Sequence, residues 1–259
     1  MMKNFWTVFC TIILTITMVL IMISYAIEST VINTLSSELT AKKVSGKIMD
    51  FVIDYNMNEL DDINNIVKSS KQIHKITRKF LNATIENVSY NKETYTDIHN
   101  EIYKLVNEEL SNNINEETRN KIISDFNNYG NELENEFEIY LSGFNYNYQE
   151  LFKIYYILTG NTFRIASFVV LCISLITLIL LQKIKSINEI KNATIITFII
   201  ATLFLILIKL SQNYIDQNLA GGRLNNLNTT MLNIFIVILA LLSAILVLLN
   251  IKLKDKYEV

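Results

Sequence analysis

Residues 5–27 read FWTVFCTIILTITMVLIMISYAI, an apolar run without a charged residue, proline or glycine. A helix needs about 20 such residues to cross the roughly 30 Å hydrocarbon core of a bilayer. Three further apolar runs follow at 165–182, 193–210 and 231–251. The sequence therefore predicts an all-α integral membrane protein with four transmembrane helices.

A polar block, residues 28–160, separates the first two runs. It holds 21 Asp/Glu and 13 Lys/Arg, a net charge of −8, whereas the rest of the chain has a net charge of +6. An acidic block beside a basic membrane part argues against nucleic acid as a partner. Cys10 and Cys172 both lie in apolar runs, so disulfides do not staple this block, which is large enough to bury its own core.

Helical patterns run through the block. The chain has no proline and only six glycines, which favours long helices over sheets with their many turns. Apolar residues at i, i+4 steps continue the first run as far as Leu39, and the pattern resumes at Val44 with one phase slip. We expect a helical bundle whose first and last helices are continuous with membrane helices.

Short motifs predict where some of these helices begin and end. Asn58 and Ser70 are suitable N-caps, and Thr94-x-x-Asp97 resembles a capping box with Asp in place of Glu. Gly130 suits the C-terminal end of a helix.

An acidic run alternates with apolar residues at Glu132, Glu134, Glu136 and Glu138. Period-two alternation is typical of a strand, but the helical period on both flanks favours a helix here. We interpret the run as a solvated face, with a cation-attracting patch as the alternative.

The lysines near the run ends predict the topology. If the chain crosses the membrane four times, seven lysines lie on the same side of it, namely Lys3, Lys183, Lys185, Lys191, Lys252, Lys254 and Lys256. The other side has Lys153, Arg164, Lys209 and Arg223. Because short cytoplasmic segments are rich in Lys/Arg, both termini are predicted to be cytoplasmic and the polar block to lie outside. Arg164 and Lys209 would snorkel to the headgroups.

The predicted organisation is a cytoplasmic N-terminus with the first transmembrane helix at 1–27, an extracytoplasmic helical domain at 28–160, and helices two to four at 161–259. The first run could instead be a signal peptide cleaved after Ala26. Its apolar stretch is longer than the usual 7–15 residues of such a peptide, which favours a retained anchor.

One basic stretch is a candidate binding surface. Residues 68–79 read KSSKQIHKITRK, and on a helix the basic residues lie opposite the apolar ones. They form a possible anion-binding face for headgroups or cell-wall polymers, comprising Lys68, Lys71, Lys75, Arg78 and Lys79. We favour a solvated face in an otherwise acidic domain, with anion binding as the alternative. No catalytic or metal-binding motif surrounds His74 or His99, so we expect no catalytic residues, metal or cofactor.

Two segments suggest a source. The stretches VINTLSSELTAKKVSGKIMDFVIDY at 31–55 and IVKSSKQIHKITRKFLNATI at 66–85 resemble membrane proteins of low-GC Gram-positive bacteria. The resemblance implies a bacterial plasma membrane, an N-terminal anchor, a helical extracellular domain and further spans. It implies no activity.

The layout of span, helical bundle and span also resembles chemoreceptor-type ligand domains. It favours a non-enzymatic membrane protein that presents an extracellular sensing or protein-interaction domain and acts through a membrane partner or a second copy. A permease-like subunit of an ABC-type transport or cell-envelope complex is the alternative, since such permeases also place a large outer domain after the first of four spans. The apolar runs have no acidic residue in their interiors, which argues against a self-sufficient transporter.

Overall fold

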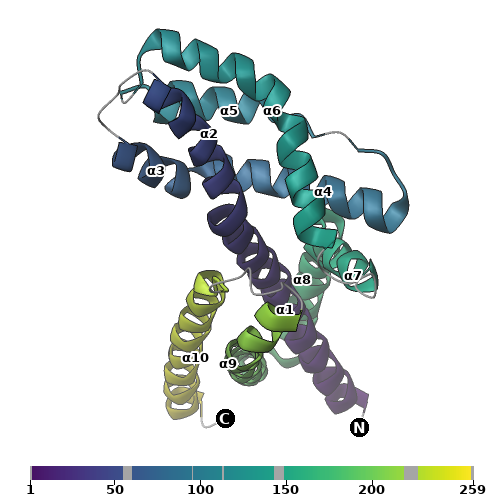
Figure 1. Cartoon of the computed structure of the whole chain (residues 1–259). Coiled ribbons are helices and arrows are strands. Elements are labelled where there is room, and N and C mark those ends of the chain that lie inside the picture. The colour runs from purple at the N-terminus through teal and green to yellow at the C-terminus, as the bar shows by residue number, and fades with distance from the viewer. Residues whose placement is uncertain are drawn as a thin grey trace. The chain divides into compact units, whose positions relative to one another are not determined.

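The computed structural model describes residues 2–54, 60–94, 96–112, 114–142, 149–218 and 227–257. Within these residues the chain is helical and forms no strand, which confirms the predicted all-α class (Figure 1). The chain divides into two compact units. Unit 1 comprises 1–30, 157–212 and 228–259, and unit 2 comprises 31–156 and 213–227.

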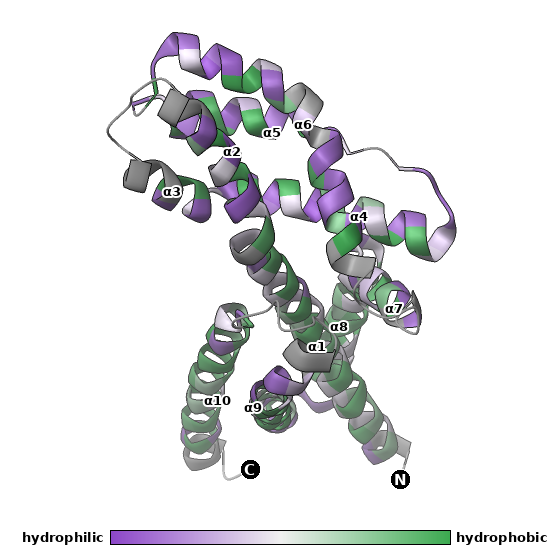
Figure 2. Ribbon diagram, in the orientation of Figure 1, coloured by the Kyte–Doolittle hydropathy of each residue, from purple (hydrophilic) through white to green (hydrophobic). Residues whose placement is uncertain are grey.

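Unit 1 is built from long apolar helices. They are the first part of α1 (Met2–Leu35), α8 (Asn161–Gln182), most of α9 (Ser186–Asn218) and α10 (Thr230–Tyr257). Three helical stretches in the described part of the chain are long and apolar enough to cross a membrane, at 4–35, 161–214 and 230–253. Figure 2 shows the apolar colouring along these helices.

The middle stretch folds back on itself. The 3-10 turn η4 (Lys183–Lys185) joins α8 to α9 without a gap, so the second and third apolar runs form one helical stretch. Lys183 has φ 50°, in the left-handed region, where a right-handed helix cannot continue.

Contacts with α1 give the helix directions in unit 1. Gln182, at the end of α8, donates to Thr7 Oγ1 at 2.5 Å, while Arg164 near its start contacts Glu28. Helix α8 is therefore antiparallel to α1. Glu189, at the start of α9, accepts from Thr11 at 3.3 Å, and Ala201 farther along clusters with Met22 and Ala26. Helix α9 is therefore parallel to α1 and antiparallel to α8.

The last helix, α10, begins beside Tyr25, whose ring centroid lies 6.5 Å from that of Phe235, and runs opposite to α1 (Figure 1). It packs through Leu232 and Leu239, whereas much of its remaining apolar surface is exposed, as at Leu248. All four helices of unit 1 leave large apolar side chains exposed, a surface that suits a hydrocarbon solvent.

Unit 2 begins within α1. The chain stays helical through a π-helical turn, η1 (Ser36–Thr40), into α2 (Ala41–Asp54). This wider turn shifts the helical phase, which confirms the slip predicted between Leu39 and Val44. Buried hydroxyls meet here, because Ser36 donates to Thr77 at 3.0 Å and Thr77 Oγ1 lies 2.7 Å from Thr40 Oγ1.

The remaining elements of unit 2 are α3 (Leu60–Ser69), α4 (Lys71–Tyr90), α5 (His99–Lys104), the π-helical turn η2 (Leu105–Glu109), α6 (Glu116–Ser142) and most of α7 (Gln149–Thr159). Ser70 caps α4 by accepting from the Gln72 N–H at 3.0 Å, as predicted. Asn91 ends α4 with φ 48°, a conformation that Asn tolerates.

Two predicted helix boundaries are wrong. Helix α6 continues through Gly130 to Ser142, because Tyr129 and Leu133 on either side are buried in the core, which outweighs the roughly 1 kcal/mol cost of a helical glycine. Thr94 caps no helix, since its hydroxyl donates to Glu86. Helix α5 begins at His99, whose N–H donates to Asp97 Oδ1 at 2.9 Å.

Two other predictions concern helix ends and the acidic run. The predicted N-cap Asn58 lies outside the described residues. The acidic run from Glu132 to Glu138 lies within α6, which confirms its helical interpretation.

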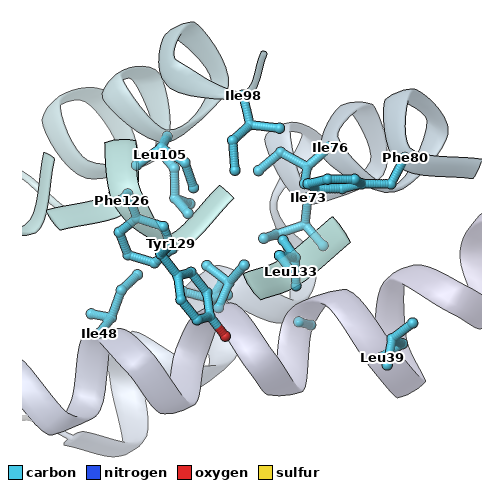
Figure 3. Close-up of a cluster of buried hydrophobic side chains, with 14 of the residues drawn as sticks. Leu39, Ile48, Ile73, Ile76, Phe80, Ile98, Leu105, Phe126, Tyr129 and Leu133 are labelled. Atoms are coloured by element: carbon cyan, nitrogen blue, oxygen red, sulfur yellow. The ribbon is translucent and has the colours of Figure 1, made fainter. Parts of the chain in front are cut away.

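The core of unit 2 lies where α2, α4 and α6 meet (Figure 3). The rings of Phe80 and Phe137 stack with centroids 5.2 Å apart, and both side chains are fully buried. Phe126 and Tyr129 form an edge-to-face pair at 5.1 Å, close to Ile48 of α2. Truncating a buried aromatic residue such as Phe80 to alanine costs about 3–5 kcal/mol, so this core holds the helices in register.

Candidate functional site

The predicted anion-binding face lies at the junction of α3 and α4. Lys68 is in the last turn of α3, and Lys71 begins α4 directly after its cap. Lys75 and Arg78 follow on the exposed side of α4, away from the buried Ile73 and Ile76. The structure therefore keeps these four basic residues on the surface of the same part of unit 2.

The fifth residue of the predicted face, Lys79, has partners on α5 and on the segment just before it. Its ammonium donates to Glu101 Oε2 at 2.8 Å and to the Asp97 carbonyl oxygen at 2.7 Å, which ties α4 to α5. The charge of Lys79 is thus neutralised within the unit.

An open pocket of about 370 Å³ lies beside Lys79. Residues from α4 and from the segment after it line the pocket, namely Lys79, Asn82, Ala83, Glu86, Thr94, Thr96 and Asp97. Most of these side chains are polar, and both signs of charge are present. No sequence motif indicates this pocket, because its shape depends on how the segment after α4 folds back against that helix.

A hydrogen-bonded carboxylate stands at one end of this pocket. Glu86 accepts from the Tyr156 hydroxyl at 2.6 Å, and from Lys92 Nζ and Thr94 Oγ1 at 3.0 Å each. The hydrogen bonds from Tyr156 and Lys92 lower the pKa of Glu86, and the bond to Glu86 raises the pKa of Tyr156. The carboxylate is therefore charged at neutral pH and fastens α7 to the end of α4.

Unit 1 has a polar cluster of its own, which we call the Arg164 cluster (Ser24, Tyr25, Glu28 and Arg164). Arg164 Nη2 lies 2.5 Å from Glu28 Oε2, and 13% of each side chain is exposed. The guanidinium also donates to Ser24 Oγ at 2.9 Å and lies 4.1 Å from the Tyr25 ring centroid. Sequence reasoning found Arg164 but missed Glu28, the acidic residue that closely follows the first apolar run.

A second set of polar contacts, the N-terminal polar layer (Thr7, Thr11, Gln182 and Glu189), joins α1 to α8 and α9 nearer the N-terminus. Three exposed rings pack together beside it, from Phe5, Trp6 and Phe9. Exposed aromatic rings of this kind are typical of residues at a membrane–water interface.

The two histidines lie on α4 and at the start of α5. His74 Nδ1 lies 3.0 Å from the Ser70 carbonyl oxygen, and His99 is exposed at the start of α5. Among the described residues, no group of three or more His, Cys, Asp or Glu could hold a metal ion. Arg223, counted in the predicted topology, lies outside those residues.

Comparison with known proteins adds no relative: no protein-family model, curated protein or solved structure matches this chain.

Proposed function

We propose that this chain is a non-enzymatic, multi-pass protein of a bacterial plasma membrane. In this proposal α1, α8, α9 and α10 each cross the bilayer, both termini are cytoplasmic, and unit 2 lies outside. Unit 2 serves as a sensing or protein-interaction domain, and the chain acts through another membrane protein or a second copy of itself.

The spacing of the two polar sets in unit 1 supports four crossings. Thr7 of the N-terminal polar layer and Glu28 of the Arg164 cluster are about 20 residues apart along α1, which at 1.5 Å per residue is roughly 30 Å. This length matches the hydrocarbon thickness of a bilayer. The hairpin turn at Lys183–Lys185 adjoins the N-terminal polar layer, so α8 and α9 each run the length between the two sets.

The orientation rests on the basic residues at that hairpin. Lys183 and Lys185 are exposed in the turn, and Lys191 follows in the first turns of α9. A short loop rich in lysine favours the cytoplasmic side. The opposite end of α8 carries Arg164, which Glu28 neutralises, and the opposite part of α9 carries a single lysine, Lys209.

The observation that carries the proposal is the unbroken helical path from Met2 to Asp54. Met22 and Ala26 on this path belong to a buried cluster of unit 1, and Leu39 and Ile48 belong to the core of unit 2. A small axial or rotational shift of one helix is a known form of transmission between packed elements. A change in the core of unit 2 on binding would therefore have a helical route into unit 1.

Cysteine labelling tests the topology. In a background with Cys10 and Cys172 replaced by serine, we expect Asn100→Cys in α5 to react with a membrane-impermeant maleimide on intact cells. Lys185→Cys in the hairpin turn should react only after permeabilisation. Both positions are exposed in the structure, so a lack of reaction reports the membrane and not burial. The reverse pattern would overturn the proposed orientation, and labelling of both positions from outside would overturn the four crossings.

Purification from native membranes tests the mode of action. After crosslinking in intact cells, we expect the chain to be recovered with a second copy or with an integral membrane protein that has no ATP-binding domain. Recovery of a stoichiometric complex with an ATPase would overturn the proposal in favour of a permease subunit. Recovery of the monomer alone, at crosslinker levels that capture a known membrane complex in the same cells, would overturn the need for a partner.

A further inference from the structure

Three lysines of unit 2, Lys68, Lys71 and Lys75, are grouped at the junction of α3 and α4. Most lysines elsewhere in the described part of the unit form ion pairs with carboxylates, namely Lys43, Lys47, Lys79, Lys92, Lys121 and Lys153. Lys104 of α5 is an exception, because it is exposed and has no ion pair within the described residues. Lys68, Lys71 and Lys75 are exposed and have no ion pair or hydrogen bond within the described residues. Yet the polar block that contains them has a surplus of acidic residues.

The position of these lysines is electrostatically unfavourable. Lys71 and Lys75 are one turn apart on the same helix, at a spacing where like charges repel. Both lie in the first turns of α4, where the helix dipole is positive and no acidic residue compensates. Lys68 adds a third positive charge from the end of α3. The fold therefore concentrates positive potential at the junction of α3 and α4. The repulsion among these lysines lowers the stability of unit 2 when no partner is bound.

We propose that Lys68, Lys71 and Lys75 form a docking surface for a polyanion with closely spaced phosphate groups. Charge complementarity is the reason, because an extended anionic chain can contact several of these ammonium groups at once. A lipid surface fits less well, since the exposed neighbours of the lysines, Asn65 and Ser69, are polar and offer no apolar side chain for insertion. This proposal names a partner class for the interaction domain proposed above and rests on it.

The test uses the full chain in nanodiscs of neutral phosphatidylcholine, titrated with short-chain inorganic polyphosphate. We expect binding that weakens with salt, with a slope of log K against log salt near two, as for about three phosphate contacts on a flexible strand. The double substitution Lys71→Gln/Lys75→Gln should weaken binding about 25-fold, or about fivefold per lysine, and flatten the slope. Lys104→Gln is the matched control, because Lys104 is an exposed lysine of α5 in the same unit.

Three results would overturn the proposal. One is an equal loss of affinity in Lys104→Gln, which would indicate a response to net charge alone. Another is the absence of polyphosphate binding at low salt. The third is binding to phosphatidylglycerol vesicles but not to polyphosphate, which would assign the surface to lipid. These outcomes are distinct from the failure of the proposed topology, because binding in nanodiscs does not depend on which side of a cell membrane unit 2 occupies.

Discussion

Arg164 and Glu28 form an ion pair of 2.5 Å across 136 residues of sequence, between two helices that are otherwise apolar along most of their length. Ser24 and the Tyr25 ring surround the guanidinium. Two charges so far removed from water are tolerated only when each satisfies the other. The pair therefore fixes the register of α1 against α8 and leaves neither Arg164 nor Glu28 without a counter-charge.

Removing one partner of this ion pair should lower the free energy of unfolding more than replacing both partners with apolar residues. We expect Glu28→Gln to lower the free energy of unfolding of unit 1 by about 3 kcal/mol, because it leaves the Arg164 charge buried without a counter-charge. The double substitution Glu28→Leu/Arg164→Met should recover most of that loss. Thermal unfolding in detergent micelles, followed by circular dichroism, measures both.

The control for this prediction is Lys153→Gln, which breaks an ion pair with the largely exposed Glu150. That change should cost less than about 1 kcal/mol. A double variant as unstable as Glu28→Gln would show that lost packing, and not an unpaired charge, explains the effect.

The bond between Tyr156 and Glu86 should make unit 2 sensitive to acid. The Tyr156 hydroxyl is the largest cause of the lowered pKa of Glu86. The folded pKa is below the unfolded one, so the stabilisation is present at neutral pH and is lost as the pH falls through the folded pKa. We expect Tyr156→Phe to cost about 1 kcal/mol at neutral pH, and less at a pH below both pKa values.

Thermal unfolding of the wild type and of Tyr156→Phe across the acidic range would measure that difference. Tyr90→Phe is the matched control, because its ring lies 5.7 Å from the Tyr156 ring and the side chain is nearly half exposed. A constant difference between Tyr156→Phe and the wild type at all pH values would show that the hydroxyl does not act through Glu86.

Local sequence patterns predicted the features that depend on near neighbours. The N-cap at Ser70 needs only a hydroxyl and the N–H two residues later. The phase slip before Val44 could be predicted from the spacing of apolar residues. The buried residues on each side of the π-helical turn keep a regular helical period. The basic face was predictable from the same helical period. The exception is Lys79, which pairs with Glu101.

The missed features depend on contacts between distant segments. Tyr156 and Glu86 are 70 residues apart, and neither belongs to a motif that indicates the other. The error at Gly130 has a similar origin, because glycine favours a helix end locally while the burial of Tyr129 and Leu133 holds the helix together. Tertiary packing overrides a local preference of about 1 kcal/mol wherever two large side chains are buried beside it.

The buried hydroxyl of Thr77 should hold the π-helical turn in place. It accepts from Ser36, and it can donate to Thr40 Oγ1 at 2.7 Å or to the Ile73 carbonyl oxygen at 2.8 Å. Thr77→Val keeps the shape but removes the acceptor for Ser36, so we expect a loss of about 1–2 kcal/mol. Faster amide hydrogen exchange between Ser36 and Thr40 should accompany the loss. Thr84→Val is the control: it removes a buried hydroxyl that donates to the Phe80 carbonyl oxygen of the same helix, and it should leave exchange at the π-helical turn unchanged.

Glu134 should be a site where removing a charge stabilises the protein. Burial, and then repulsion from Glu138 one turn later, raise the pKa of Glu134. Because the folded pKa exceeds the unfolded one, ionisation costs stability above the folded pKa, and this cost disappears as the pH falls below the unfolded value. We therefore expect Glu134→Gln to raise the free energy of unfolding by about 0.5 kcal/mol at neutral pH, the size of a like-charge pair on a helix, and to have little effect in acid.

The matched control for Glu134→Gln is Glu132→Gln, an exposed carboxylate on the same helix whose neutralisation should change the unfolding free energy less. Chemical denaturation of both variants at neutral and acidic pH separates burial from net charge. If general repulsion within the acidic run were responsible, the two substitutions would stabilise equally. If the burial of the half-buried Glu134 side chain dominates, only Glu134→Gln should stabilise the protein, and this gain should vanish once the wild-type carboxyl is protonated.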